Sequence, residues 1–388
     1  MPCRSFTLAF SAAVFLAGET GCDRPAQKER NASTGSPAAG AQEAQPEATS
    51  DIKKDEEVIF YPTYACQTGS DASWTVAIHG SIFEPELTSL KRGAAVELLC
   101  AALGLPRREA ETDIFRQRAR AFLVDNERGK NIVIRLGNKV YASGTSEPNG
   151  HFAATLHFSA AEADRLRQDG VDREGWLAFE AVNRRGDDRT FAGRVQWIAP
   201  EGRSVISDID DTIKISNVQD REALLANTFL RDFRPVPGMA VLYRKWAETG
   251  AAFHYVSASP WQLYQPLSGF CRSGGFPAGS FHMKLFRLKD SSALSLLASQ
   301  EGYKKEVLEK ILADFPLRRF TLVGDSGEQD PEVYAAVARK HPEQIEHVFI
   351  RNARGRGSEP ARFQKAFEGI PAVRWKVFEK PEDLPEGL

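Results

Sequence analysis

Residues 203–380 alternate between short apolar runs, rich in β-branched residues, and amphipathic stretches long enough for helices. The runs typical of strands are RSVISDID (203–210), AFHYVSAS (252–259), RRFTLVGDS (318–326), IEHVFIRN (345–352) and VRWKVFEK (373–380). The stretches typical of helices are GMAVLYRKWAETG (238–250), YKKEVLEKILADF (303–315) and PEVYAAVARKHP (331–342). This alternation predicts an α/β fold in which helices cover both faces of a parallel sheet.

The first of these strands ends in a cluster of acidic residues. The stretch SVISDIDDTIKISNV (204–218) places Asp208, Asp210 and Asp211 within four residues, directly after the apolar Val205 and Ile206. Carboxylates this close repel one another, and an unpaired buried charge is costly. We therefore expect a cation, or a phosphate group with its cation, to bind here.

Other polar residues stand at the ends of the neighbouring strands. Ser257 ends the second strand, Asp325 and Asp330 follow the third, and Lys304 lies at the start of the helix between them. The carboxyl ends of parallel strands converge on one cleft, where ligands bind. The set offers carboxylates for nucleophilic attack and proton transfer, a hydroxyl and an ammonium for phosphoryl oxygens, and oxygen ligands for Mg²⁺.

The order of these residues resembles that of the haloacid dehalogenase (HAD) superfamily, with its DxDx[TV], Ser/Thr, Lys and GDxxxxD motifs. SVISDIDDTIK, YVSASPWQLY and LVGDSGEQDPEVY are also similar to the App1-type phosphatidate phosphatase family, over about residues 203–351, and GSIFEPE (80–86) is similar to the family's upstream region. Ala258 departs from the family, which is expected to have Asn there. The resemblance implies a HAD-like (Rossmannoid) catalytic domain over residues 201–388, which would hydrolyse phosphatidate to diacylglycerol and phosphate.

The resemblance implies catalytic roles for four residues. Asp208 would attack phosphorus and become an aspartyl phosphate. Asp210 would protonate the leaving oxygen and then deprotonate the water that hydrolyses the intermediate. Ser257 and Lys304 would stabilise the transferring phosphoryl group. Lys305 is the alternative to Lys304 as the catalytic lysine.

The resemblance also implies Mg²⁺ as the cofactor. The Asp208 side chain, the backbone carbonyl of Asp210 and Asp325 would hold the ion. Asp330 would support either the waters of the ion or Lys304. The side chains of Asp208 and Asp325 and the backbone carbonyl of Asp210 all offer oxygen atoms, which are the ligands that Mg²⁺ prefers.

Four nearby residues have supporting or alternative roles. We expect Thr212 to fix the geometry of the loop after the first strand, and Asp211 to form local hydrogen bonds rather than to catalyse. Trp261 and Tyr264 follow the second motif, where they either line the mouth of the substrate site or pack in an aromatic cluster.

Residues 58–200 have a different pattern, with short alternating runs separated by turn signals such as Gly-Asn and Asn-Gly. This pattern predicts a β-sandwich-like domain, for which the immunoglobulin-like fold is the candidate, with one helix over about residues 86–103. Cys66 and Cys100 can form a disulfide in an oxidising compartment. The alternative, which we favour, is that both are small buried residues like Cys271.

The N-terminal residues are typical of an export signal. Residues 1–22 contain Arg4 and then the apolar run FTLAFSAAVFLAG (6–18), which is short for a membrane span. Cys22 resembles the lipid-attachment cysteine of bacterial lipoproteins, although Glu19 stands where that signal has an aliphatic residue. Residues 23–57 are polar and contain almost no large apolar residue, which predicts a disordered linker. The chain is therefore expected to be exported, and either periplasmic or anchored to a membrane through Cys22.

The composition limits the classes of partner. A formal net charge of −2 gives no overall attraction to nucleic acid, so we expect no nucleic-acid partner. The stretch from Thr212 to the helix near Gly238 leaves room only for a short flap, and the 47 positions from Ser257 to Lys304 are modest for a large cap domain. The open cleft that this implies suits a lipid phosphate presented at a membrane surface. The alternatives are an exported phosphatase for soluble phosphomonoesters, and a non-enzymatic binding protein with a vestigial phosphatase fold. The sequence does not identify a protein partner or an oligomeric state.

Overall fold

The structure is a computed structural model that describes residues 40–41, 43–69, 72–85, 96–97, 99–101, 103–172, 174–285, 301–353 and 360–388. The predicted signal peptide 1–22, with Cys22, and residues 23–39 and 42 of the predicted linker 23–57 lie outside these residues. The rest of the predicted linker is described, and Ile52 in it is buried. The helix predicted over residues 86–103 also falls largely outside them, although residues 96–97 and 99–101 are helical. The described residues belong to one compact unit, residues 38–388.

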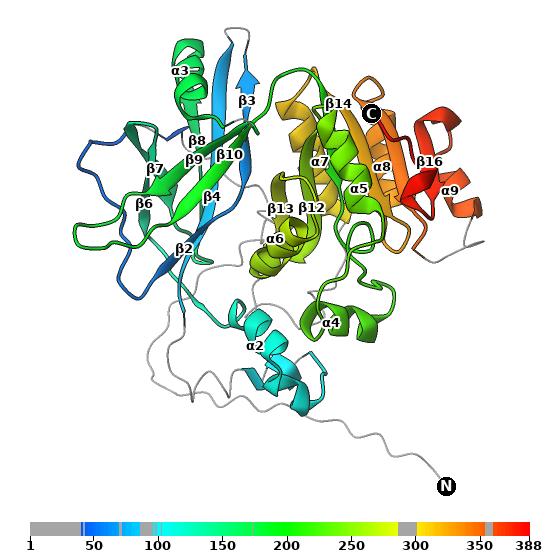
Figure 1. The fold of residues 1–388 in the computed structure, drawn as a ribbon, viewed down its shortest axis with the longest axis horizontal. Coiled ribbons are helices and arrows are strands. Elements are labelled where there is room, and N and C mark those ends of the chain that lie inside the picture. Colours follow the sequence, from blue (N-terminus) through cyan, green and yellow to red (C-terminus); the bar gives the residue numbers. More distant parts are fainter. Residues whose placement is uncertain are drawn as a thin grey trace, which may run out of the picture. The chain divides into compact units, whose positions relative to one another are not determined.

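The first half of this unit is built on one ten-stranded, mostly antiparallel sheet, called sheet A here (Figure 1). Its hydrogen-bonded order is β1-β8-β4-β3-β10-β9-β6-β7, and β2 and β5 pair with β4. The strands are β1 (Gly40–Ala41), β2 (Glu57–Phe60), β3 (Thr63–Thr68), β4 (Ser73–Glu84), β5 (Asp125–Asn126), β6 (Asn131–Leu136), β7 (Lys139–Thr145), β8 (His151–Phe158), β9 (Trp176–Ala181) and β10 (Ala192–Trp197).

Sheet A curls so that its two ends meet. Next to β1, Glu43 forms a bridge with Tyr141 of β7, the strand at the opposite end of the order. Buried residues alternate along β4 and β8, because successive side chains point to opposite faces of a strand. The inward-facing residues from both ends of the sheet form one core, which includes Val76, Ile134 and Leu156. This half consists mainly of β-strands, and all ten belong to one hydrogen-bonded sheet, so the two-sheet sandwich stays a prediction.

Three helical segments accompany sheet A. They are the 3-10 turn η1 (Arg107–Glu111), helix α2 (Asp113–Arg120) and helix α3 (Ala160–Gly170). Thr112 caps α2, because its hydroxyl accepts the backbone N–H of Phe115. Ser159 and Glu162 form a capping box at the start of α3.

The second half contains a six-stranded parallel sheet, called sheet B here, with the order β13-β12-β11-β14-β15-β16. Its strands are β11 (Arg203–Ser207), β12 (Ala252–Pro260), β13 (Ser280–Lys284), β14 (Arg319–Asp325), β15 (Ile345–Arg351) and β16 (Trp375–Phe378). The chain leaves β11 toward β12 on one side and returns to β14 on the other. The α/β fold with a parallel sheet is confirmed, and the strand order reverses at β11.

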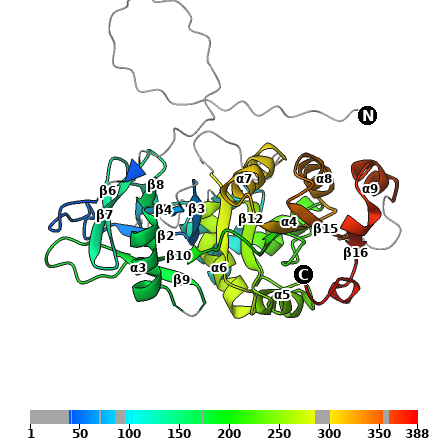
Figure 2. The same ribbon diagram turned by 90° about the horizontal axis from the view of Figure 1, so that it is seen from above.

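Helices cover both faces of sheet B (Figure 2). In that view α5 and α6 lie on one face, and α7 and α8 on the other. The residues of β11 alternate accordingly, since Val205 belongs to the core with α5 and Ile206 to the core with α7 and α8. The helices and 3-10 turns are α4 (Arg221–Phe229), α5 (Met239–Glu248), η2 (Trp261–Leu263), α6 (Tyr264–Ser273), α7 (Glu301–Asp314), α8 (Asp330–Lys340), α9 (Pro360–Ala366), η4 (Ala372–Arg374) and η5 (Pro381–Asp383).

The domain boundary predicted near residue 200 falls between β10, the last strand of sheet A, and β11, the first strand of sheet B. The two halves make direct polar contacts. The hydroxyl of Tyr64 in β3 donates to Asp314 of α7 at 2.6 Å, and the backbone N–H of Phe281 in β13 donates to the carbonyl of Pro62 at 3.1 Å. The division into two folding domains stays a prediction. Within the described residues, no helix is both long enough and apolar enough to cross a membrane.

Candidate active site

The predicted site residues meet at the carboxyl end of sheet B. Asp208 directly follows β11, and its backbone N–H donates to the carbonyl of Val323 in β14 at 2.9 Å. Ser257 lies in β12, the other neighbour of β11, and Asp325 ends β14. This is the point at which the strand order reverses, where open α/β sheets bind their ligands.

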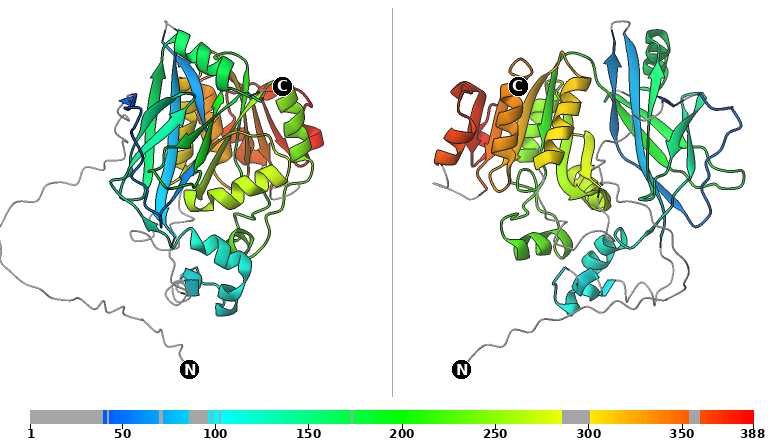
Figure 3. Two further views of the ribbon diagram at one scale, coloured as in Figure 1. Left: turned by 60° about the vertical axis from the view of Figure 1, so that its left-hand side comes forward. Right: turned by 180° about the vertical axis from the view of Figure 1, so that it is seen from behind.

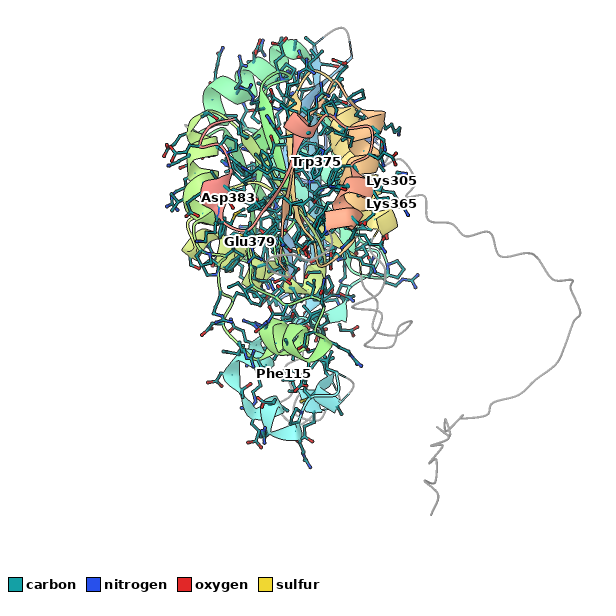
Figure 4. All side chains as sticks on the ribbon, turned by 90° about the vertical axis from the view of Figure 1, so that its right-hand side faces the viewer. Phe115, Lys305, Lys365, Trp375, Glu379 and Asp383 are labelled. Atoms are coloured by element: carbon teal, nitrogen blue, oxygen red, sulfur yellow. The ribbon has the colours of Figure 1, made fainter. Side chains whose placement is uncertain are left out.

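Lys304 lies at the centre of an ionic cluster. Its ammonium nitrogen is 2.8 Å from Oδ1 of Asp208, 2.7 Å from Oδ1 of Asp330 and 2.9 Å from Oε2 of Glu328. Burial alone would lower the pKa of this lysine, but the carboxylates around it raise its pKa well above the ordinary value. Lys304 is therefore a fixed positive charge beside Asp208. Its neighbour Lys305 is exposed and lies on the surface, as Figure 4 shows.

Asp208, Asp325 and Asp330 form a buried acidic cluster whose oxygens lie within 4.8 Å of one another. Asp330 uses both of its oxygens, since Oδ1 contacts Lys304 and Oδ2 accepts the backbone N–H of Asp325 at 3.2 Å. Oδ2 of Asp208 and Oδ2 of Asp325, in contrast, are buried and have no hydrogen-bond donor among the described residues.

The electrostatics of this cluster suit a cation. Burial raises the pKa of Asp208 and of Asp325 well above the ordinary value, and neighbouring carboxylates add to the effect for both groups. Two buried carboxylate oxygens without donors are costly unless a positive charge lies between them. The donor set consists of oxygens only, as hard divalent cations prefer. Asp208 and Asp325 thus fit a metal ion, and Asp330 fits the support of Lys304.

Asp210 is held by polar groups at both oxygens. Its Oδ1 is 2.7 Å from the ammonium of Lys214 and accepts the Ser216 hydroxyl at 2.7 Å. Its Oδ2 accepts the hydroxyls of Ser257 at 3.2 Å and of Ser259 at 2.9 Å. Burial alone would raise the pKa of Asp210, but Lys214 and the hydroxyl donors lower it to about 2.

The loop after β11 is fixed by Asp211. Its carboxylate accepts the backbone N–H groups of Ser216, Asn217 and Val218 at 2.7–2.9 Å. Asp211 itself has a φ of 55°, in the left-handed region that few residues other than glycine adopt. These contacts agree with the local hydrogen-bonding role predicted for Asp211. The Thr212 hydroxyl is buried and has no hydrogen-bond partner among the described residues, so its predicted role stays a prediction.

A pocket opens beside Asp208 and Asp210. Its wall is largely apolar, and much of it comes from helix α4. The lining residues are Asp208, Asp210, Val218, Leu224, Leu225, Thr228, Phe229, Ala258, Ser259, Pro260, Leu263 and Glu328. Trp261 and Tyr264 do not line this pocket but pack against Tyr61, which lies between β2 and β3, with ring centroids 4.1 and 4.9 Å from the Tyr61 ring. Of the two roles predicted for Trp261 and Tyr264, lining the substrate site or packing in an aromatic cluster, their contacts agree with aromatic packing.

Four polar contacts of the site were missed from the sequence. Lys214, Ser216 and Ser259 contact Asp210, and Glu328 contacts Lys304. All four stand within or beside the motifs quoted above, so proximity to a motif was the available signal. Lys214 is the most informative, because a lysine with a relative exposure of 1% must have a buried anionic partner.

The described cysteines are reduced. Cys66, Cys100 and Cys271 are all buried and free. Burial raises the pKa of Cys66 to about 11 and that of Cys271 to about 12, which keeps both thiols protonated. The structure agrees with the favoured prediction of small buried residues rather than with a disulfide between Cys66 and Cys100.

Residues 203–352 match the family model for the catalytic domain of phosphatidate phosphatase APP1. This segment is similar to the APP1 catalytic domain. The phosphatidate phosphatase APP1 of Saccharomyces cerevisiae is 35% identical over 159 residues, which are 40% of this chain and 27% of that protein. An uncharacterized protein of Schizosaccharomyces pombe is 30% identical over 168 residues, 42% of this chain and 27% of that protein. The predicted resemblance to the App1-type family is confirmed for this segment.

The similarity to the APP1 catalytic domain is confined to part of each protein. This chain spans about a quarter of the length of the curated relatives that it matches. Sheet A and helix α2 lie outside the matched residues. Among solved structures, a mutant ferredoxin-NADP+ reductase from Plasmodium falciparum aligns over 76% of this chain and 95% of its own, with a TM-score of 0.18 and 8% identity, which carries no argument about the fold.

Proposed function

We propose that this chain is a Mg²⁺-dependent phosphatase of the HAD type that hydrolyses phosphatidate to diacylglycerol and phosphate. One observation carries the proposal. A buried carboxylate with an unpartnered oxygen, Oδ2 of Asp208, lies beside Lys304 at the end of β11, within the segment similar to the APP1 catalytic domain. The similarity supports phosphatidate as the substrate, and the acidic cluster supports a metal ion.

The proposed first step transfers the phosphoryl group to Asp208. A carboxylate oxygen of Asp208 attacks phosphorus, the bond between phosphorus and the glycerol oxygen breaks, and Asp210 donates a proton to that oxygen. In the free protein Lys214 keeps Asp210 ionised. A bound phosphate dianion favours the protonated form of a neighbouring carboxyl group, so substrate binding would supply the acid form.

The second step frees the enzyme. Asp210 takes a proton from water, the water oxygen attacks phosphorus, and the bond to Asp208 breaks to release inorganic phosphate. Lys304 stabilises the negative charge of the phosphoryl oxygens throughout. Ser257, whose hydroxyl contacts Asp210 here, would turn toward a phosphoryl oxygen when substrate is present. Asp208, Asp325 and the backbone carbonyl of Asp210 would hold Mg²⁺, which would neutralise charge on the phosphoryl group.

Other parts of the proposal concern the chain outside the site. The two ends of sheet A share one core, which supports a sandwich-like arrangement for the β-rich half. We also propose that residues 1–22 direct export, with Cys22 as a lipid anchor that brings the enzyme to a lipid phosphate at a membrane surface.

The test is phosphate release from phosphatidate vesicles, with Mg²⁺ or with EDTA, for the wild-type protein and Asp208→Asn. We expect release that requires Mg²⁺ and is lost in Asp208→Asn. Release from a soluble phosphomonoester but not from vesicles would retain the chemistry and refute phosphatidate as the substrate. Release from neither would refute the phosphatase and favour a binding role for the β-rich half.

A further inference from the structure

Helix α2 contacts the helix that forms the wall of the pocket. Phe115 and Phe122, on and just after α2, pack against Phe229 of α4 with ring centroids 6.1 and 5.7 Å apart. Phe115 is fully buried. Figure 3 shows α2 beside α4 from two sides, and Figure 4 labels Phe115 where they meet. Helix α2 is outside the residues similar to the APP1 catalytic domain, whereas α4 is inside them.

Arg118 makes the polar part of this contact. Its Nη1 donates to the backbone carbonyl of Thr228 at 2.6 Å, and its guanidinium carbon is 4.0 Å from the ring centroid of Phe233. Thr228 is in the last turn of α4, where carbonyls lack partners within the helix and the helix dipole favours a cation. Burial lowers the pKa of Arg118 to about 10, so the guanidinium stays charged at neutral pH.

The opposite side of α4 faces the catalytic loop. Asn227 donates through Nδ2 to the carbonyl of Ser216 at 3.0 Å, and the Ser216 hydroxyl contacts Asp210. Leu224, Leu225, Thr228 and Phe229 of α4 line the pocket. Helix α4 is therefore attached to the catalytic loop on one side and to α2 on the other.

We propose that α2 determines specificity by fixing α4 as an apolar wall for the non-reacting, apolar part of a phosphomonoester substrate, with Arg118 as the positioning residue. This inference rests on the proposed function. The phosphate group would be bound by Lys304 and by the Mg²⁺ that the acidic cluster would hold, and α2 contacts neither Lys304 nor the cluster in the described residues. Loosening α4 should therefore weaken binding of the tail far more than binding of the phosphate.

The test compares long-chain with short-chain ligands. Binding of n-dodecyl and n-butyl phosphonate, which have no ester bond to hydrolyse, is measured by titration calorimetry, and phosphate release is measured with the two corresponding alkyl phosphates. We expect the wild-type protein to prefer the long chain in both measurements. In Arg118→Ala this preference should fall about tenfold, a factor typical of a lost contact. Butyl phosphonate affinity should change by less than about threefold.

Two variants control the test. Arg118→Lys keeps a cation and a donor for the Thr228 carbonyl and should restore most of the preference. Arg120→Ala removes an exposed arginine from the same helix and should behave as the wild-type protein does. Thermal unfolding verifies that each variant is folded.

The remaining outcomes separate the two proposals. Phosphonate binding with the expected pattern but no phosphate release would refute the phosphatase and keep the role of α2. A long-chain preference that survives in Arg118→Ala, equal losses for both chain lengths, or no phosphonate binding by the wild-type protein would overturn the role of α2.

Discussion

Burial distinguishes two adjacent lysines that the sequence leaves almost equivalent. Lys304 has a relative exposure of 2% and contacts Asp208, Asp330 and Glu328, whereas Lys305 is exposed. We predict that Lys304→Met lowers kcat for phosphate release by at least about a hundredfold, because a fixed charge beside the phosphoryl group is lost. Lys305→Met, the matched control, should retain kcat within about twofold. Equal effects of the two changes would contradict the assignment.

Lys214 forms a comparable buried ion pair with Asp210. It is buried, and its ammonium is 2.7 Å from Oδ1 of Asp210. We predict that Lys214→Met lowers kcat by roughly a hundredfold, the usual contribution of a well-placed acid or base, because Asp210 loses the group that orients it. Steady-state phosphate release measures the change. Lys245→Met, which breaks the exposed pair with Glu386, controls for the loss of a lysine ion pair. An unchanged kcat in Lys214→Met would argue against this role.

At the scale of elements, the end of β14 is packed tightly against the start of α8. Gly324 has no side chain, and a Cβ there would overlap Asp330 and the ring of Tyr334. We predict that Gly324→Ala displaces Asp330, lowers kcat more than about tenfold and destabilises the protein by about 1–3 kcal/mol, since overpacking is costly. Phosphate release and urea unfolding test this.

Gly302 provides the control for that change. It lies two residues before Lys304 on α7, and among the described residues, apart from its chain neighbours and the nearby backbone of α7, no atom lies within 4 Å of a Cβ placed there. Gly302→Ala should leave kcat unchanged and stabilise the helix by up to about 1 kcal/mol, because alanine is the better helix former. A loss of activity in Gly302→Ala as large as in Gly324→Ala would show that the overlap with Asp330 is not the cause.

The elements differ in how well the sequence predicts them. The strands that carry Asp208, Ser257 and Asp325 were predicted correctly, because buried parallel strands are continuous apolar runs. Helix α4 was expected only as a short flap, although Asp220 provides a cap signal that could have indicated it. Its position could not be predicted, because it packs against α2, more than a hundred residues earlier in the chain.

The side-chain contacts of the candidate site also differ in how well the sequence predicts them. Motif order brought Asp208, Lys304 and Asp330 together in the prediction, and the structure places them in one ionic cluster. The contact between Lys214 and Asp210 was not foreseen, because a lysine after an acidic motif is equally typical of a solvated loop. Only the burial of that loop under α4 makes the lysine an internal ion-pair partner.

At the scale of the whole molecule, buried histidines make stability depend on pH. Nε2 of His79 lies 3.1 Å from Nδ1 of His151, and burial lowers the pKa of His151 to about 4 and that of His79 well below the ordinary value. The unfolded chain takes up protons below about pH 6.5, whereas the folded protein resists them. Stability should therefore be complete above about pH 6.5 and fall as the pH decreases toward 4.

Urea unfolding at several pH values between 7.5 and 5 measures this dependence. The free energy of unfolding of the wild-type protein should decrease over that range, and His151→Gln should decrease less steeply, because one titrating group is gone. His254 also has a pKa lowered by burial and should maintain part of the slope in the variant. A wild-type stability independent of pH in this range would contradict the prediction.

The two edges of sheet B are closed in different ways. At one edge, β16 is short and carries the exposed Lys376. At the other edge, Pro62 from the first half of the chain lies beside β13, and the Pro62 carbonyl accepts the backbone N–H of Phe281. Open strand edges are templates for aggregation, and short strands, lysines and covering segments suppress it. Residues 203–352 produced alone would lose both of these safeguards, so the part of the chain that is similar to a known catalytic domain should aggregate when separated from the rest.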